Sequence, residues 1–206
     1  MKEKILDMAR QLYNDHGLSA VTARIICDRL KISLGSYSYH FPDKKNILID
    51  LYNEMLLEIQ AIYTSMQTTE PDILTYLDSH RLLFLLQEKY KFFYMNLFEI
   101  LTNQPEIMHT HKQKRSEEMA MAKQIFLYYM QKGILKTNIS ESQIERLIHV
   151  GEILNNYWPI DAAVSADREE SDRLIHYMKI CCGLLEPYLE SESHMAYNDY
   201  FKRFEK

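Results

Sequence analysis

The most informative segment of this sequence reads Ile32-Ser33-Leu34-Gly35-Ser36-Tyr37-Ser38-Tyr39-His40-Phe41-Pro42-Asp43-Lys44. Ser33 can cap a short helix over residues 34–40, because its hydroxyl can accept a hydrogen bond from a free backbone N–H of the first turn. Pro42 cannot continue that helix. Asp43 can then cap a long helix over about 44–66, which carries apolar residues on one face. The segment therefore predicts a short helix that runs directly into a long one.

The residues before this segment complete a compact motif. A helix over 3–16 has an apolar stripe, and Gly17 is a natural stop at its C-terminus. Thr22 can cap a second helix over about 23–30, which a tight turn, Lys31–Ser33, joins to the helix over 34–40. Two short helices joined in this way form a helix-turn-helix, which places its second helix in the major groove of DNA.

The rest of the chain also has helical periodicity. No segment alternates convincingly at period two, so the sequence predicts an all-α protein: a three-helix helix-turn-helix head on a larger helical-bundle body. Ser140-x-x-Gln143 and Asp167-x-x-Glu170 resemble capping boxes that begin two of the helices. The further helices are expected at about 72–87, 89–102, 105–132, 140–158, 167–187 and 194–204.

Composition and charge exclude several classes of protein. The 206 residues have a net charge of −5, but residues 1–50 carry eight Lys and Arg against six Asp and Glu, so a slightly basic head precedes an acidic body. The three cysteines form no CxxC motif, and no apolar run approaches the roughly 18 residues of a membrane span. The sequence predicts a cytoplasmic protein without disulfides, membrane contact, metal or cofactor.

Many positions of residues 4–50, in the correct order and spacing, resemble the N-terminal domain of TetR-type transcriptional regulators. They include Ile5, Ala9, Leu12, Tyr13, Gly17, Thr22, Ile26, the run from Ile32 to Lys44, and Leu48. The resemblance implies a helix-turn-helix DNA-binding domain over residues 1–50 and a helical ligand-binding and dimerisation domain over 51–206. It implies a regulator of transcription, acting as a repressor that a small-molecule ligand releases from DNA.

The candidate DNA contacts lie on the second and third helices and at the start of the fourth. Free N–H groups at helix N-termini attract phosphate, and side chains of a recognition helix reach base edges, thymine methyls or phosphate. Arg24 is expected to contact the DNA backbone, and Lys44 to contact a phosphate. The resemblance and this chemistry together give the set Thr22, Arg24, Ser33, Leu34, Gly35, Ser36, Tyr37, Tyr39, His40 and Lys44.

Two positions depart from the pattern of the family. Ser38 stands where the family usually has a tyrosine that contacts phosphate, so Tyr37 or Tyr39 would have to replace that contact in part. Lys31 stands where the family usually has glycine in the turn. If the turn needs a positive φ, lysine costs on the order of 1 kcal/mol there.

Aromatic residues and an asparagine of the body are candidates for a ligand pocket, although a helical core uses the same residue types. His109-x-His111 is a poor metal site, because residues two apart point to different sides of a helix. The cysteines are expected to be core residues rather than redox sensors. The candidate ligand residues are Phe93, Tyr94, Phe98, Phe126, Tyr129, Asn155 and Trp158.

The resemblance also implies a symmetric homodimer, formed through the helices at about 140–158 and 167–187, which binds a palindromic operator in double-stranded DNA. Both helices have apolar stripes, which could instead be consumed within one subunit. The effector would act by shifting the population of dimers away from a spacing that fits successive major grooves, with the helix at 44–66 as the lever.

Two other functions compete with this one. The chain could be a DNA-binding regulator without small-molecule control, governed by a protein partner or by its abundance; side chains filling the cavity would favour that alternative. An enzyme is the third possibility. The sequence has no phosphate-binding glycine loop, HExxH or GxSxG, so we do not expect catalysis.

Overall fold

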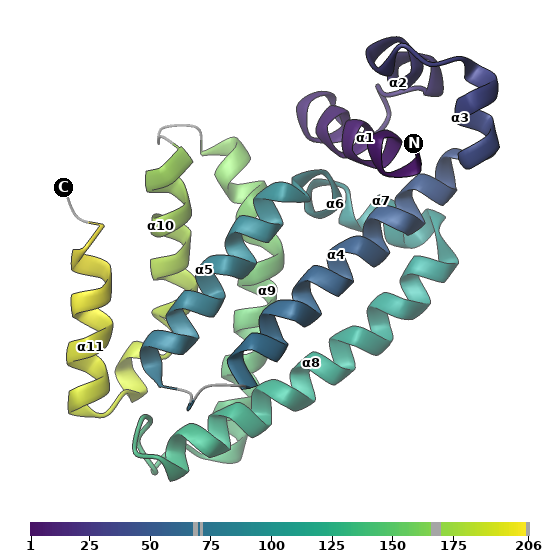
Figure 1. Ribbon diagram of the computed structural model, residues 1–206. Helices are drawn as coiled ribbons and strands as arrows, with labels where there is room; N and C mark the ends of the chain where they lie inside the picture. Colours follow the sequence, from purple (N-terminus) through teal and green to yellow (C-terminus); the bar gives the residue numbers. More distant parts are fainter. Residues whose placement is uncertain (68–69, 71, 166–169, 205–206) are drawn as a thin grey trace. The chain divides into compact units, whose positions relative to one another are not determined.

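The computed structural model describes residues 1–67, 70, 72–165 and 170–204. The chain divides into two compact units (Figure 1). Unit 1 comprises Met1–Gln60 and Leu86–His111, and unit 2 comprises Ala61–Leu85 and Lys112–Lys206. In the described ranges every regular element is a helix, apart from an isolated antiparallel bridge between Leu135 and Leu189. None of the described helices is both long and apolar enough to cross a membrane.

In unit 1, the second, third and fourth helices of the chain begin where capping residues predict, and the first helix ends at the predicted glycine. Thr22 and Ser33 each accept a hydrogen bond from the backbone N–H three residues on, and the Asp43 carboxylate accepts one from the N–H of Lys45. Gly17 closes the first helix with φ 82°. The unit contains α1 (Lys2–His16), α2 (Ala23–Leu30), α3 (Leu34–His40), α6 (Lys91–Met95), α7 (Leu97–Asn103), most of α4 (Lys44–Gln67) and the start of α8 (Pro105–Gln131).

The core of unit 1 forms where α1 packs against α2 and α6. The Tyr13 ring of α1 lies 5.3 Å from the Phe92 ring of α6, and Tyr52 of α4 stacks on Phe93 at 5.1 Å. The predicted apolar stripe of α1 is confirmed, because Ile5, Leu6, Ala9, Leu12 and Tyr13 are all buried. The predicted boundary between the two functional domains, after residue 50, falls inside α4. The division into a DNA-binding and a ligand-binding domain stays a prediction.

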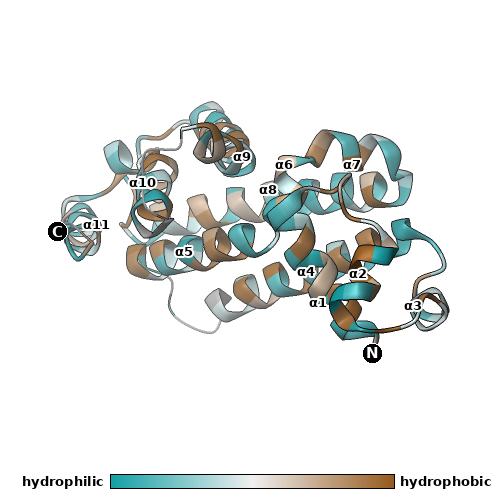
Figure 2. Ribbon diagram, turned by 90° about the horizontal axis from the view of Figure 1, so that it is seen from above, coloured by the Kyte–Doolittle hydropathy of each residue, from teal (hydrophilic) through white to brown (hydrophobic). Residues whose placement is uncertain are grey.

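Unit 2 has a core of its own. Figure 2 shows hydrophobic and hydrophilic residues alternating around its longer helices, as expected of amphipathic helices that pack together. The Ser140 capping box at the start of α9 is confirmed. The unit contains most of α5 (Ile73–Lys89) and α8, together with α9 (Glu141–Val164), α10 (Glu170–Cys182), a short 3-10 helix (Glu186–Tyr188) and α11 (Ser191–Lys202).

Three helices differ from the sequence prediction. The helix expected over 89–102 is broken between α6 and α7 at Asn96, whose side-chain amide donates to the Phe92 carbonyl at 2.7 Å and competes with the helical ladder. α9 continues past the buried Pro159 to Val164. α10 ends at Cys182, five residues before the predicted end, and a tight turn follows in which a Cβ at Gly183 would lie 2.6 Å from the Lys179 carbonyl. The predicted cap Asp167 lies outside the described residues.

Candidate nucleic-acid interface

Three of the candidate DNA contacts in the helix-turn-helix have large, exposed side chains. Leu34 at the start of α3 is 55% exposed, Tyr39 near its end is 84% exposed, and Arg24 on α2 is exposed without an ion-pair partner among the described residues. Figure 1 shows α2 and α3 as neighbouring helices, with α3 leading into α4. These side chains are exposed to solvent, and their contact with DNA stays a prediction.

Tyr37 differs from the expectation. Its side chain is only 4% exposed, and its ring lies 6.3 Å from the Phe41 ring. Tyr37 therefore packs in the core of unit 1 instead of facing outward, because the inward side of the short α3 packs against α2. Burial, together with the nearby Cys27 and Asp43, raises the pKa of its hydroxyl. Truncating Tyr37 would disturb the core as well as any contact with DNA.

Lys44 already has partners within the protein. Its ammonium donates to the carbonyl oxygens of Leu18 and Val21 at 2.6 and 2.9 Å, and lies 5.6 Å from the centre of the Tyr13 ring. Burial lowers the pKa of this lysine, and the charge of Glu99 opposes the change. Lys44 thus ties the start of α4 to the loop between α1 and α2. A phosphate contact by Lys44 remains a prediction.

The turn between α2 and α3 has the backbone conformation that the sequence suggested. Lys31 adopts φ 54° and ψ 44°, and is the one non-glycine residue with positive φ among the described residues. Its exposed side chain adds a cation beside α3. Ser38, also exposed, leaves the usual tyrosine contact without a replacement from Tyr37, which is buried; Tyr39 remains available.

The seven candidate ligand residues are divided between the two units. Phe93 and Tyr94 are buried in unit 1, whereas Phe98 of the same unit is 82% exposed and so lies on the surface. The other four, Phe126, Tyr129, Asn155 and Trp158, belong to unit 2.

Two of those in unit 2, Trp158 and Tyr129, are buried in its core. Trp158 stacks on Phe84 with ring centres 4.8 Å apart, and Tyr129 is almost fully buried, with its hydroxyl donating to the Asp72 carbonyl at 3.4 Å. These two side chains are part of the hydrophobic core, as residues of their types commonly are in a helical protein.

Two polar groups of unit 2 were missed from the sequence. His80 sits one turn after Tyr76 on α5, with ring centres 4.0 Å apart and Nδ1 2.9 Å from the Tyr76 carbonyl; burial lowers the pKa of His80 to about 4. Glu118 on α8 lies near Glu152 on α9, and burial with this second carboxylate raises the pKa of Glu118 to about 7. The i,i+4 spacing could have indicated the first pair. The second depends on how α8 and α9 pack.

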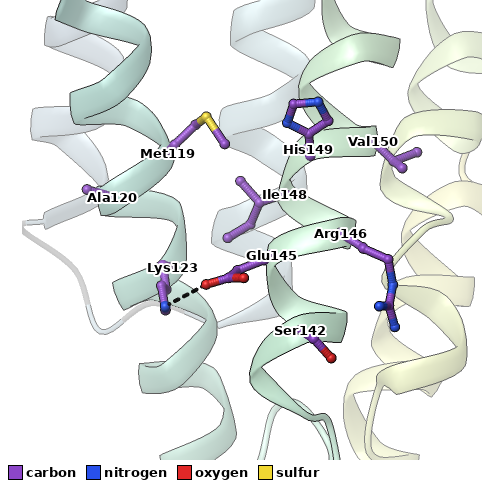
Figure 3. A pocket seen from close by; sticks show the side chains of 9 residues that line it. All are labelled: Met119, Ala120, Lys123, Ser142, Glu145, Arg146, Ile148, His149 and Val150. Atoms are coloured by element: carbon purple, nitrogen blue, oxygen red, sulfur yellow. Dashed lines mark hydrogen bonds and ion pairs between the residues drawn. The ribbon is translucent and has the colours of Figure 1, made fainter.

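A surface pocket of about 720 Å³ lies between α8 and α9 (Figure 3). Lys123 on α8 bridges to Glu141 and Glu145 on α9 along one edge. The volume of this pocket is within the range of small-molecule sites. None of the seven candidate ligand residues lines it. The lining consists of Met119, Ala120, Lys123, Ser142, Glu145, Arg146, Ile148, His149 and Val150.

An exposed apolar stripe runs along α9. It consists of Val150, Ile153, Tyr157 and Val164, and Ile180 is similarly exposed on α10. The spacing of three, four and seven residues puts the α9 members on one side of the helix. Unit 2 therefore does not bury the apolar residues of these two helices completely.

The comparisons agree with the helix-turn-helix geometry. The family model described as "Bacterial regulatory proteins, tetR family" matches residues 5–51, and the model described as TetR, "Bacterial transcriptional repressor", matches residues 53–197. No curated protein matches the chain.

Solved structures share the fold at low sequence identity. A TetR-family transcriptional regulator from Marinobacter aquaeolei VT8 is 18% identical, with a TM-score of 0.90 over 100% of this chain and 99% of that one. A putative transcriptional regulator from Saccharomonospora viridis in complex with choline is 18% identical, with a TM-score of 0.71 over 92% and 97%. The fatty acid degradation regulator FadR from Bacillus halodurans is 14% identical, with a TM-score of 0.65 over 89% and 93%.

A capped helix-turn-helix of this kind is typical of DNA-binding regulators. Since one family model covers most of the chain and a second covers the head, the chain belongs to the TetR family and is a transcriptional regulator.

Proposed function

We propose that this regulator is a homodimeric repressor that a small molecule, bound in the helical body, releases from its operator. The observation that carries the DNA-binding part is the capped helix-turn-helix, with Arg24 exposed on α2 and Leu34 and Tyr39 exposed on α3. The cationic and aromatic side chains suit phosphates and base edges. The acidic charge of the body leaves DNA binding to the head.

Two features support the dimer and the effector. The exposed stripe on α9 offers an apolar surface for a second copy, as a two-fold interface requires. The 720 Å³ pocket between α8 and α9 is large enough for a small molecule. A neighbour in fold was solved with choline. The effector would release the DNA through its difference in affinity for the DNA-bound and free states.

A regulator without small-molecule control is the second candidate. The close stacking of Trp158 on Phe84 and the burial of Tyr129 favour it, because side chains occupy the interior where a ligand was expected. In this case a protein partner or the abundance of the regulator would set the occupancy of the operator.

Binding to DNA tests the proposal. Fragments from immediately upstream of the gene and scrambled fragments are titrated with protein at two salt concentrations. The proposal requires tighter, salt-sensitive binding of the upstream fragment by two chains per site. Equal binding of both fragments at both salts, together with no enriched sequence in a selection from random DNA, would refute it.

Release by ligand is tested on the same complex. A panel of small molecules that includes choline is added, and dissociation from the operator is followed by fluorescence anisotropy. Release by one member supports the effector model. Retention of DNA throughout a broad panel, with no change in thermal stability, favours the second candidate.

A further inference from the structure

Helix α3 lacks the side chains that usually specify bases. Its seven residues, Leu34–His40, include no Arg, Lys, Asn or Gln. Arg and Lys form the common paired hydrogen bonds to guanine, and Asn and Gln form those to adenine. α3 is therefore left with its apolar and aromatic surfaces, its hydroxyl groups and the His40 ring for the recognition of bases.

The large exposed side chains of α3 are a leucine and a tyrosine, and the small Ser38 is exposed as well. Leu34 and Tyr39 are the large hydrophobic residues of this helix that remain exposed, whereas Tyr37 is buried. The ring of Tyr39 meets the ring of His40 edge-on, with centres 5.1 Å apart. A leucine left in water on a DNA-facing helix gains stability only when an apolar group of the DNA covers it.

Gly35 leaves space beside Leu34 that the protein itself does not need. A Cβ at Gly35 would meet only the Ser33 hydroxyl at 3.8 Å, an ordinary contact, and the residue has no positive φ. Glycine in a helix costs on the order of 1 kcal/mol relative to alanine. Its absence of a side chain thus serves the approach of an external surface to the first turn of α3, next to Leu34.

The cations of the motif lie outside α3. Arg24 and Arg29 are exposed on α2, and Lys31 is exposed in the turn. From these positions they can neutralise phosphates and orient the motif, which supplies affinity without requiring a guanidinium on α3.

We propose that α3 reads its operator chiefly through the 5-methyl groups of thymines, with Leu34 as the principal contact and Tyr39 as the second. The thymine methyl is the apolar group that base pairs present in the major groove. Each half-site should therefore contain thymines where α3 lies, and their methyl groups, not only their hydrogen-bonding pattern, should determine affinity. This inference rests on the proposed binding of operator DNA by the head.

The test replaces each thymine of the footprinted half-site by deoxyuridine, which removes the methyl group and keeps the base pair. Affinity is measured by fluorescence anisotropy at one salt concentration. We expect a loss of about fourfold per methyl contacted, the factor that corresponds to burying one such group. In the Leu34→Ala variant the same replacement should have less effect.

A matched variant controls for the loss of an exposed leucine. Leu57 on α4 is 66% exposed and lies outside the helix-turn-helix, so Leu57→Ala should keep the full penalty for deoxyuridine. Circular dichroism confirms that both variants are folded.

The outcomes separate the two proposals. Less than a twofold effect at every thymine, in an operator preferred over scrambled DNA, would overturn the reading by methyl groups and leave the function intact. An undiminished penalty in Leu34→Ala would overturn the role of Leu34. Failure to prefer any DNA sequence would overturn the proposed function and this inference with it.

Discussion

Lys44 is a residue whose structural role competes with its expected role on DNA. Its ammonium satisfies two backbone carbonyls, those of Leu18 and Val21, in the loop that leads to α2. The sequence indicated a cation in the first turn of a helix, where the helix dipole disfavours it. These two hydrogen bonds give Lys44 a structural role that does not depend on DNA.

Lys44→Ala should therefore have two effects. Loss of the charged hydrogen bonds should lower the free energy of unfolding by about 1–3 kcal/mol, measured by urea denaturation. Loss of a phosphate contact should weaken binding to all sequences alike and flatten the salt dependence by about one unit of slope.

The neighbouring exposed Lys45, which pairs with Asp43 at 3.5 Å, provides a control for stability, because Lys45→Ala should change it little. A less stable Lys44→Ala variant with an unchanged salt slope would eliminate the phosphate contact and leave the structural role.

Glu118 is a carboxyl group that the folded chain prefers in its protonated form. Burial and the Glu152 carboxylate, with a smaller contribution from Glu117, raise its pKa to about 7, and Lys114 opposes the change. The Arg115 guanidinium forms a bidentate ion pair with Glu152 and not with Glu118. The folded state thus holds a proton that the unfolded state releases at lower pH.

Glu118→Gln should stabilise the protein at pH 8. Between the usual carboxyl pKa and about 7 the wild-type folded state binds more protons than the unfolded state, so its stability falls as pH rises. The variant should unfold at higher urea than wild type at pH 8, and the difference should shrink at pH 5.

Glu117→Gln is the matched control. Lys114 and Gln113 lower the pKa of the Glu117 carboxyl, and Glu117 contributes least to the raised pKa of Glu118, so this variant should gain much less stability at pH 8 than Glu118→Gln does. Equal pH profiles for wild type and Glu118→Gln would contradict the raised pKa.

At the scale of elements, the turn between α2 and α3 decides how the motif is held. Lys31 occupies the left-handed region at the C-cap of α2, and its backbone N–H donates to the Cys27 carbonyl. A glycine would adopt this conformation without steric cost, whereas a lysine strains its Cβ. The turn therefore has the left-handed conformation that glycine favours, but a lysine occupies this position.

Lys31→Gly should raise the free energy of unfolding by about 0.5–1 kcal/mol, after allowance for the greater freedom of glycine in the unfolded chain. Lys31→Ala removes the same charge but keeps the Cβ, so its stability should match wild type. Urea denaturation gives both values. If the side chain contacts phosphate, both variants should bind DNA more weakly; equal stability of the two variants would show that the conformation carries no such cost.

The elements also show where sequence patterns suffice. Thr22, Ser33, Asp43 and Ser140 begin helices as predicted, because a cap is a local arrangement of a side chain and the next three residues. The break at Asn96 was not predicted. The residues on both sides of Asn96 are apolar, and such a sequence pattern does not distinguish one long helix from two short ones.

At the scale of the whole molecule, the exposed apolar stripe on α9 is the feature that supports a dimer. Val150, Ile153, Tyr157 and Val164 remain exposed while Trp158 and Pro159 on the other side are buried. An apolar face of this kind on an otherwise charged surface is typical of an interface. The symmetric operator expected for the family would require two heads, hence two chains.

Ile153→Glu should convert the dimer to monomers, because Ile153 is 54% exposed near the middle of the stripe and a two-fold axis would bring two buried carboxylates together. Light scattering at micromolar concentration measures the mass. Leu57→Glu, at a more exposed leucine of unit 1, should remain dimeric. A wild-type protein that scatters as a monomer would contradict the interface.

The sequence by itself determined the all-α fold, the helix-turn-helix and its caps, because periodicity, capping and the punctuation by Gly17 and Pro42 act over a few residues. The tertiary structure decided which side chains of those helices face outward. It turned Tyr37 inward, placed Phe98 on the surface and set Glu118 near Glu152. These outcomes depend on how helices distant in sequence pack, since burial and pKa are properties of the surroundings and not of the residue.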